Sequence, residues 1–387
     1  MAIATAWAKR WRCSINQDKS KVVVFGQKQK RIDDWMLGGG RIEQVDSYKY
    51  LGVDVKGNLK WADMKKRLVN KTRRIMTKAW AMGVQSGHLS VKAADAIWKV
   101  IVRPTAEYGA EIWGEDKWEE MEKIQRVMGK RILGLDQSTT NEVVLGELGW
   151  WRMKARRDML KMRYWWKLMN MGKECLPRKV YEWELRRKET AQIGYRTWTT
   201  HTEKLLTEIG LETYWHSQNV NIKQEEWNRI VGERIHDREQ RIWRKSVCER
   251  PKLRTYRKFK KELKMEEYLE SEDSKGRRLM ARLRSGTNNL RIETGRRNGL
   301  TREERRCWFG CDYIEDEEHF LQKCWLYDDI RNDWVNEVGE RALKQEGLAL
   351  MTGTGSKSET KAAIKYINRA VAKRRRILEL MGRGGQI

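Results

Sequence analysis

The sequence predicts a mainly helical protein with a small α+β piece at its N-terminus and a zinc knuckle near its C-terminus. Three observations predict this class. The chain has three prolines in 387 residues, which favours long uninterrupted helices. From Trp61 onward, apolar residues recur at helical spacing. Strand-like runs are confined to residues 1–57.

Residues 1–57 contain three strand-like runs. The run KVVVF (21–25) is rich in β-branched residues, residues 41–45 alternate apolar and polar side chains, and YKYLGVDV (48–55) is predicted as a third strand. Gly38, Gly39 and Gly40 suit a turn between the first two runs. We expect this piece to be too small to stand comfortably by itself.

Residues 58–175 are predicted to form amphipathic helices. The clearest apolar stripe is Trp151, Ala155, Met159, Met162, Trp166 and Met169. The other face of this helix is cationic, with seven Arg or Lys between Trp150 and Asn170 against the single acid Asp158. Such a face is either solvated or in contact with nucleic acid. The residues predicted to make that contact are Arg152, Arg156, Lys161, Arg163 and Lys167.

Residues 176–295 are predicted as a basic, Trp-rich helical connector. Residues 176–248 are poorly periodic and favour short helices. The run 250–264 then carries eight cations and one acid. Because cations follow phosphates and aromatic rings stack on bases, we expect this run to contact single-stranded nucleic acid or RNA. The predicted contacts are Arg254, Tyr256, Arg257, Lys258, Phe259 and Lys260.

Residues 296–340 contain the most specific motif, C-x3-C-x7-H-x4-C, formed by Cys307, Cys311, His319 and Cys324. Three thiolates and one imidazole fill the tetrahedron of a structural zinc ion and leave no position open for water. The sequence therefore predicts a zinc site that holds structure. A chance cluster of buried thiols is the alternative.

Residues 341–387 are predicted as a basic helical tail behind a linker at 351–360. The run Lys373–Arg376 is either a nuclear import signal or a phosphate-binding patch. The run Tyr327-Asp328-Asp329 resembles a polymerase carboxylate pair, but it directly follows Cys324 and runs into polar residues. We therefore expect a helix to begin there.

The composition indicates a nucleic-acid partner. Lys and Arg number 81 and Asp and Glu 54, for a formal net charge of +27, and a polyanion gains affinity from such a surface by counterion release. A membrane is disfavoured because no apolar run approaches the roughly 20 residues of a span. The isolated Cys13, Cys175 and Cys248 are typical of a reducing compartment. We expect an intracellular protein, in nucleus and cytoplasm.

The order of several motifs resembles the C-terminal portion of the reverse transcriptases of non-LTR (LINE-type) retrotransposons. Asn16-Gln17-Asp18-Lys19-Ser20 precedes KVVVF, and Tyr50-Leu51-Gly52 follows. The segments RPTAEYGAEIW, LGELGW and LRSGTNNLRIETGR come next, and the series ends in the Cys and His motif. The resemblance covers most of residues 1 to 335.

The resemblance implies a role for each region. Residues 1–57 would be the end of a polymerase palm, with Tyr50, Leu51 and Gly52 as a primer grip and Lys19 as an auxiliary proton donor to pyrophosphate. Residues 58–175 would be a helical thumb. The partners would be RNA or DNA, as template–primer, element RNA or target DNA.

The family's catalytic aspartate pair lies upstream of these motifs and is not in this sequence. Mg²⁺ is therefore expected only where that core is present, and we expect the chain not to be catalytic by itself. Two alternatives stay open: the chain belongs to an intact active reverse transcriptase, or it is a domesticated zinc-bearing interaction protein.

Overall fold

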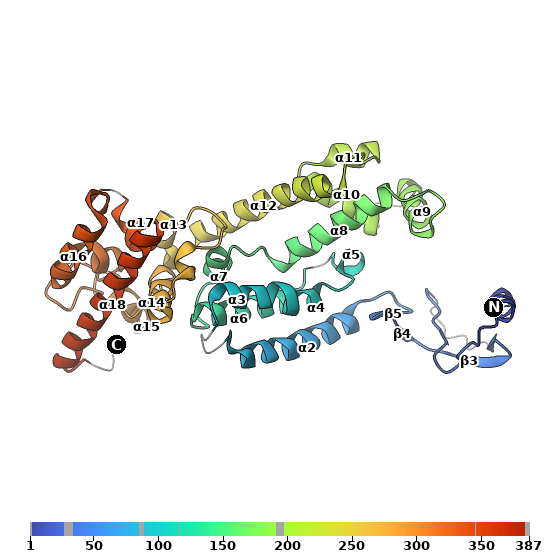
Figure 1. Cartoon of the computed structure of the whole chain (residues 1–387), viewed down its shortest axis with the longest axis horizontal. Helices are drawn as coiled ribbons and strands as arrows, with labels where there is room; N and C mark the ends of the chain where they lie inside the picture. Colours follow the sequence, from blue (N-terminus) through green and yellow to red (C-terminus); the bar gives the residue numbers. More distant parts are fainter. Residues whose placement is uncertain are drawn as a thin grey trace. The chain divides into compact units, whose positions relative to one another are not determined.

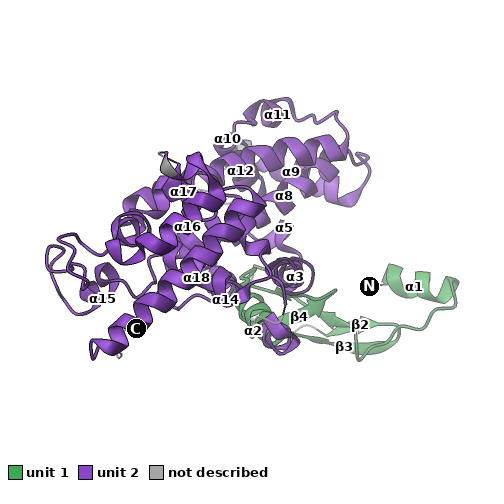
Figure 2. Ribbon diagram, turned by 60° about the vertical axis from the view of Figure 1, so that its left-hand side comes forward, with its two compact units in different colours: residues 1–74 green, residues 75–387 purple. Residues whose placement is uncertain are grey.

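A computed structural model of the chain describes residues 2–26, 34–84, 89–115, 117–190, 197–344 and 346–383. The protein is mainly helical, as predicted (Figure 1). It divides into two compact units, residues 1–74 and residues 75–387 (Figure 2). Within the described ranges, no helix is both long enough and apolar enough to cross a membrane.

The first unit holds the strands that the structure describes. Its elements are α1 (Ala2–Arg10), β1 (Lys21–Val22), β2 (Trp35–Leu37), β3 (Gly40–Gln44), β4 (Ser47–Tyr50), β5 (Val53–Lys56) and most of α2 (Ala62–Ala79). In the three-stranded sheet, β3 lies between β1 and β2, parallel to the former and antiparallel to the latter. The KVVVF run is a shorter strand than predicted, since only Lys21 and Val22 pair with β3.

The segment YKYLGVDV forms a hairpin and not the single strand that the sequence predicted. β4 and β5 pair in antiparallel register around Leu51 and Gly52, whose φ angles are 45° and 83°. Positive φ at both central residues belongs to the turn type whose twist matches that of the flanking strands. Arg67 of α2 fixes the hairpin by donating to the Gly52 carbonyl at 2.7 Å and to Asp54 at 2.6 Å.

The first part of the second unit is a helical array. Its helices are α3 (Val91–Ile97), α4 (Arg103–Glu107), α5 (Ala110–Trp113), α6 (Glu119–Leu133), α7 (Asn141–Leu148), α8 (Met153–Met169), α9 (Leu176–Thr190), α10 (Trp198–Glu208), α11 (Glu212–Ser217) and α12 (Gln224–Glu249), with π turns at Trp80–Val84 and Trp98–Val102. α8 and α12 pack against each other. The prediction of short helices in residues 176–248 is wrong for α12, which has 26 residues.

Tryptophans fill the core between α8 and its neighbours. Trp165 and Trp227 are fully buried, with ring centroids 5.6 Å apart. Each indole N–H is satisfied: Trp165 donates to the Tyr181 hydroxyl at 3.1 Å, and Trp227 to the Met162 carbonyl at 2.9 Å. A buried Trp needs such a partner, so these side chains are structural and not available to bases.

The C-terminal part of the second unit is a smaller bundle. Its helices are α13 (Tyr256–Phe259), α14 (Ser274–Arg284), α15 (Arg291–Arg297), α16 (Asp328–Val338), α17 (Gly347–Met351) and α18 (Lys357–Leu380), with 3₁₀ or π turns at Pro251–Leu253, Glu267–Glu270, His319–Lys323, Trp325–Tyr327 and Glu340–Leu343. α18 packs against α14 and α16. Of the predicted linker at 351–360, Met351 and Thr352 are buried, and the part from Lys357 onward belongs to α18.

A buried guanidinium joins this bundle to the helical array. Arg284 of α14 donates to both carboxylate oxygens of Glu147 of α7, at 3.0 and 2.9 Å, and lies 2.8 Å from Glu266. Its guanidinium carbon is 4.5 Å from the centroid of the Phe259 ring. Two carboxylates and an aromatic face replace the water that the cation loses on burial.

Candidate metal centre and nucleic-acid contacts

The predicted zinc ligands come together in the C-terminal bundle. The ligand atoms of Cys307, Cys311, His319 and Cys324 all lie within 4.8 Å of one another. The Cys324 sulfur is 4.0 Å from that of Cys307 and 3.7 Å from that of Cys311. Thiolates at about 2.3 Å from a tetrahedral zinc ion stand about 3.8 Å apart, so these separations fit one ion.

His319 supports the fit with its ring nitrogens. The side chain is buried, and neither Nδ1 nor Nε2 has a hydrogen-bond partner in the described structure. A buried polar group without a partner costs free energy, and coordination of one nitrogen to a metal would remove part of that cost. The Tyr313 ring stacks on the imidazole at 5.8 Å, which fixes the plane of the ring.

The pKa values of the cysteine thiols also favour a bound cation. The neighbouring Cys324 sulfur and burial raise the pKa of Cys307, and burial and the neighbouring Cys307 raise the pKa of Cys311. Since the metal ligand is the thiolate, a divalent cation would supply the charge that stabilises it. Three sulfurs and one imidazole are the donors that zinc prefers.

The backbone of residues 307–324, the segment that we call the knuckle, presents these four side chains from a tight hairpin and a short turn. Cys307 donates its N–H to the Tyr313 carbonyl at 2.9 Å, and Gly310, at φ 81°, lies in the loop between the first two cysteines. Cys324 donates its N–H to the His319 carbonyl at 2.8 Å. Each ligand pair is therefore closed by its own main-chain hydrogen bond.

The acidic run before His319 anchors the knuckle to the rest of the bundle. Glu315 and Glu317 are buried: Glu315 pairs with Arg374, and Glu317 accepts from Arg254 at 2.9 Å. The Asp316 side chain accepts the His319 N–H at 2.9 Å, as expected of an acid that caps the start of a helical turn. The sequence did not reveal the distant partners of this run.

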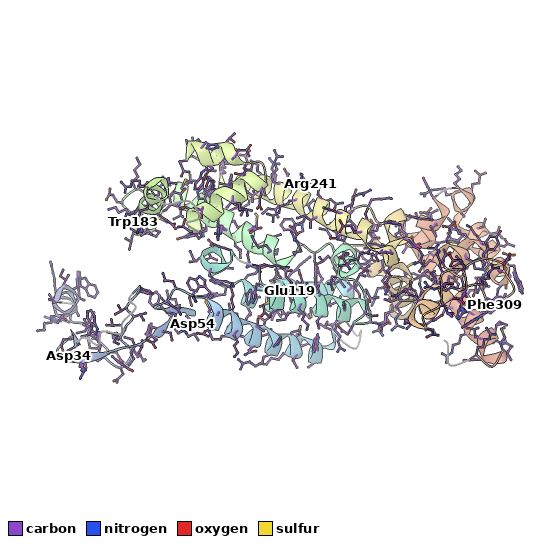
Figure 3. All side chains as sticks on the ribbon, turned by 180° about the vertical axis from the view of Figure 1, so that it is seen from behind. Asp34, Asp54, Glu119, Trp183, Arg241 and Phe309 are labelled. Atoms are coloured by element: carbon purple, nitrogen blue, oxygen red, sulfur yellow. The ribbon has the colours of Figure 1, made fainter. Side chains whose placement is uncertain are left out.

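The aromatic residues beside the ligands differ in exposure. Phe309, labelled in Figure 3, is buried with its ring 6.5 Å from that of Tyr327. Trp308 is half-buried beneath the guanidinium groups of Arg291 and Arg383, at 4.8 and 5.0 Å. Trp325 is 59% exposed, so it offers a ring face to solvent.

The cationic face of α8 is mostly neutralised by internal carboxylates. Arg152 pairs with Glu239 through two 2.7 Å hydrogen bonds, and Arg156 lies 3.3 Å from Glu107. Lys161 is buried and lies 2.5 Å from Glu115. The predicted nucleic-acid contact therefore does not hold for Lys161, and the charges of Arg152 and Arg156 are used inside the protein.

The other two predicted cations of α8 lie nearer the surface. Arg163 is half-buried, and burial lowers its pKa. Lys167 is exposed. Of the five residues predicted on this face, Lys167 is exposed, while the Arg152 side chain, 38% exposed, is paired with Glu239.

The predicted contacts in residues 254–260 divide in the same way. Tyr256 and Phe259 are buried with their rings in contact at 5.5 Å, which corrects the prediction that they stack on bases. Lys260 is also buried and paired with Glu266. Arg254 is largely buried between Glu293 and Glu317. Only Arg257 and Lys258 of this set are exposed.

Most cations of the basic run at residues 373–376 are also paired with carboxylates of the protein. Lys373 lies 2.8 Å from Asp329, Arg374 pairs with Glu315, and Arg375 lies 3.0 Å from Glu379. Asp328 and Asp329 open α16, as predicted, and so belong to a helix and not to a polymerase hairpin. A linear import signal or phosphate patch would have to break these pairs.

In the first unit, the motif residues lie at the surface. The Asn16 side chain accepts the Lys19 N–H at 2.9 Å, and the Tyr48 hydroxyl donates to the Lys19 carbonyl at 2.7 Å. The Lys19 side chain is exposed. At the hairpin turn, Tyr50 is 63% and Leu51 73% exposed, so the tip presents apolar side chains to solvent.

Three curated proteins are similar to this chain. The "Probable RNA-directed DNA polymerase from transposon X-element" of Drosophila melanogaster is 27% identical over 124 residues, 32% of this chain and 14% of that protein. The "RNA-directed DNA polymerase from mobile element jockey" of the same species is 24% identical over 179 residues, 44% of this chain and 18% of that protein. Its Drosophila funebris counterpart is 27% identical over 127 residues, 33% of this chain and 14% of that protein.

These matches confirm the resemblance that the motifs indicated. The matched segments make up less than a fifth of the curated relatives. No family model matches the chain, and no solved structure matches it.

Proposed function

Because the chain is related to the RNA-directed DNA polymerases of non-LTR retrotransposons, we propose that it is a C-terminal, nucleic-acid-binding and zinc-containing portion of such a polymerase. The observation that carries this proposal is the similarity to the X-element and jockey proteins. The net charge of +27 supports it, since a polymerase must hold the phosphate backbone of its template. By itself the portion binds and does not polymerise.

The zinc ion would have a structural role. Cys307, Cys311, His319 and Cys324 would hold it, and it would supply the charge that keeps three buried sulfurs as thiolates. All four positions of the tetrahedron are filled by these side chains, so the ion has no place for water or substrate. Its effect would be to close the hairpin at Gly310 onto the turn at His319.

The hairpin tip of the first unit would contact the nucleic acid. Tyr50 and Leu51 are exposed, and Leu51 adopts a positive φ that Gly, Asn or Asp adopt more readily. An apolar side chain kept in that conformation at the surface supports a role for the tip, here as a primer grip together with Gly52. Lys19 would stand beside it as an auxiliary proton donor when a catalytic core is present.

Other exposed cations would follow the backbone of the template–primer, element RNA or target DNA. From the residues considered above, these are Lys167 and Arg257, and also Lys258 once it leaves its ion pair with Glu318. With a nucleic-acid partner, the protein would act inside the cell, in the nucleus and the cytoplasm.

The test is a binding titration of the full chain. Fluorescence anisotropy with labelled RNA, single-stranded DNA and an RNA–DNA hybrid would be measured from 50 to 300 mM salt. Affinity should fall steeply, by about 0.7 to 0.9 in the log–log slope for each phosphate contacted. No binding at the lowest salt, or an affinity independent of salt, would overturn the proposal. Metal analysis of protein purified without chelator should find about one zinc per chain.

A second candidate function is a part in an active polymerase. It is favoured by the small share of the curated relatives that the matched segments cover, 14% to 18%. Sequencing the genomic DNA upstream would test it. An open frame with an Asp-Asp hairpin motif would support the second function, and an in-frame stop codon would contradict it.

A further inference from the structure

The C-terminal half of α12 and the adjoining segment 257–264 carry a cluster of cations. Arg241, labelled on α12 in Figure 3, lies one turn from Arg244 and Lys245. We propose that this cluster, together with Arg257, Lys261 and Lys264, is a docking surface for the phosphate backbone of a nucleic acid. We call these six residues the α12 patch. The proposal rests on the nucleic-acid-binding function above and names its surface.

Main-chain acceptors hold the two halves of the patch together. Gln240 and Arg244 of α12 both donate to the Lys261 carbonyl, at 2.7 and 3.1 Å. Arg257 donates to the Cys248 carbonyl at 3.1 Å, and Lys261 donates to the Arg257 carbonyl at 2.9 Å. Because neutral carbonyls accept these bonds, the cations are held in place without a negative charge that would offset their own.

The patch is not neutralised by nearby acids. Within the described ranges of the chain, none of its six side chains lies within 4.0 Å of a carboxylate, whereas Arg152, Arg156 and Lys161 of α8 each do. All six patch residues are exposed. Within residues 237–249 of α12 and residues 257–264, the exposed acids are Asp237, Glu249 and Glu262, half the number of the six patch cations. A net positive field therefore reaches solvent here.

The chemistry of the patch fits phosphates and not bases. Tyr256 and Phe259, the aromatic residues of this segment, are buried, so no ring is offered for stacking. Arg241 and Cys248 are seven residues apart, so this part of α12 extends about 10 Å, enough for more than one phosphate. Contacts to the backbone alone give affinity without sequence preference.

A nucleic acid fits this surface better than a membrane does. A helix that lies on a bilayer buries an apolar face in the lipid. The apolar face of α12 is already used inside the protein, since Trp227, Val231, Ile235, Trp243 and Val247 are buried.

The experiment compares two variants of the full chain that lose the same number of charges. The patch variant is Lys245→Gln, Lys261→Gln and Lys264→Gln. The control is Lys204→Gln, Arg229→Gln and Lys365→Gln, three exposed cations that are each paired with a glutamate. Lys245→Glu alone is a second patch variant, and thermal unfolding checks that each protein is folded.

The probes are labelled 20-nucleotide strands of three unrelated sequences, each prepared as RNA, as single-stranded DNA and as duplex DNA. For all of them the patch variant should lose about tenfold or more in affinity at 100 mM salt, and its salt slope should fall by about 2 to 3. The control should stay within about twofold of the original chain.

Each outcome bears on one of the two proposals. If the original chain binds and the patch variant has the same affinity as the control, the patch is excluded as the docking surface while the proposed function stands. If the original chain binds no probe, the proposed function fails and the patch with it. A patch variant that loses binding only to vesicles of anionic lipid, or for only one of the three sequences, would also overturn backbone docking.

Discussion

Arg374 of α18 donates two hydrogen bonds, at 3.0 and 2.9 Å, to the carboxylate of Glu315, which precedes the candidate metal ligand His319 by four positions. Both side chains are buried. The paired fork geometry is the strongest arrangement of an arginine and a carboxylate. It connects a helix more than 50 residues away in sequence to the knuckle, so the metal cluster is built into the bundle and is not a separate appendage.

Removing Arg374 should destabilise the bundle. In Arg374→Met, Glu315 keeps its charge without its cation in a buried site, which costs about 3 to 5 kcal/mol. The free energy of unfolding from chemical denaturation measures the loss. Arg376→Met, an exposed change on the same helix, should stay within about 0.5 kcal/mol of the original chain. If the two variants lowered the free energy of unfolding equally, the Arg374–Glu315 pair would have no special role in stability.

Removal of zinc should unfold the knuckle and destabilise the parts of the C-terminal bundle that pack against it. Cys311→Ser, or a strong chelator, should abolish the bound metal and lower the melting temperature, since metal binding and folding are coupled in such sites. Metal analysis and circular dichroism measure both effects. Cys248→Ser removes an exposed, isolated cysteine and should change neither. Retention of one zinc by Cys311→Ser would contradict the ligand assignment.

Phe259 should matter for stability and not for binding. Phe259→Ala removes a buried ring that packs against Arg284 and should cost about 3 to 5 kcal/mol. Nucleic-acid affinity per folded molecule, measured below the melting temperature, should be unchanged. If Phe259→Ala lowered nucleic-acid affinity while the free energy of unfolding stayed unchanged, the result would indicate that Phe259 stacks on bases.

Glu115 should contribute stability that depends on pH. Burial alone would raise its pKa, but hydrogen bonds and charge from His201 and Lys161 outweigh burial and lower the pKa below 4.5. A carboxyl group with a lowered folded-state pKa stabilises the protein above its unfolded pKa. Glu115→Gln should therefore cost about 1 to 3 kcal/mol near pH 6.

The difference between Glu115→Gln and the original chain should shrink as the pH falls from about 4.5 through the lowered pKa of Glu115. Denaturant unfolding at pH 3, 4.5 and 6 measures this trend. The exposed Glu303→Gln serves as the control and should show no comparable loss. A constant difference across this pH range would mean that the Glu115 charge is not stabilising.

Local patterns predicted several elements well. The stripe from Trp151 to Met169 predicted α8, and Ala155, Met159 and Met162 of that stripe are buried. The Cys and His cluster was predicted from residue types and spacing within a short stretch of chain, and the structure brings its four ligand atoms within 4.8 Å of one another. The hairpin at Leu51 was missed because a Leu-Gly pair is a weak turn signal compared with Asn-Gly.

The predicted contacts failed where partners lie far away in sequence. Arg152 and Glu239 are 87 residues apart, and Lys161 and Glu115 are 46 apart. No local window contains both members of such a pair. A basic stripe was therefore visible in the sequence, but its neutralisation was not.

The sequence by itself determined the helical class, the candidate metal cluster and the similarity to retrotransposon polymerases, because helical periodicity, ligand spacing and motif order are local or linear properties of a chain. The tertiary structure alone decided which cations and rings face solvent. Burial and charge pairing depend on side chains that folding brings together, such as Phe259 with Arg284 and Arg374 with Glu315. The α12 patch keeps its charge because folding gave its arginines carbonyl partners and not carboxylates.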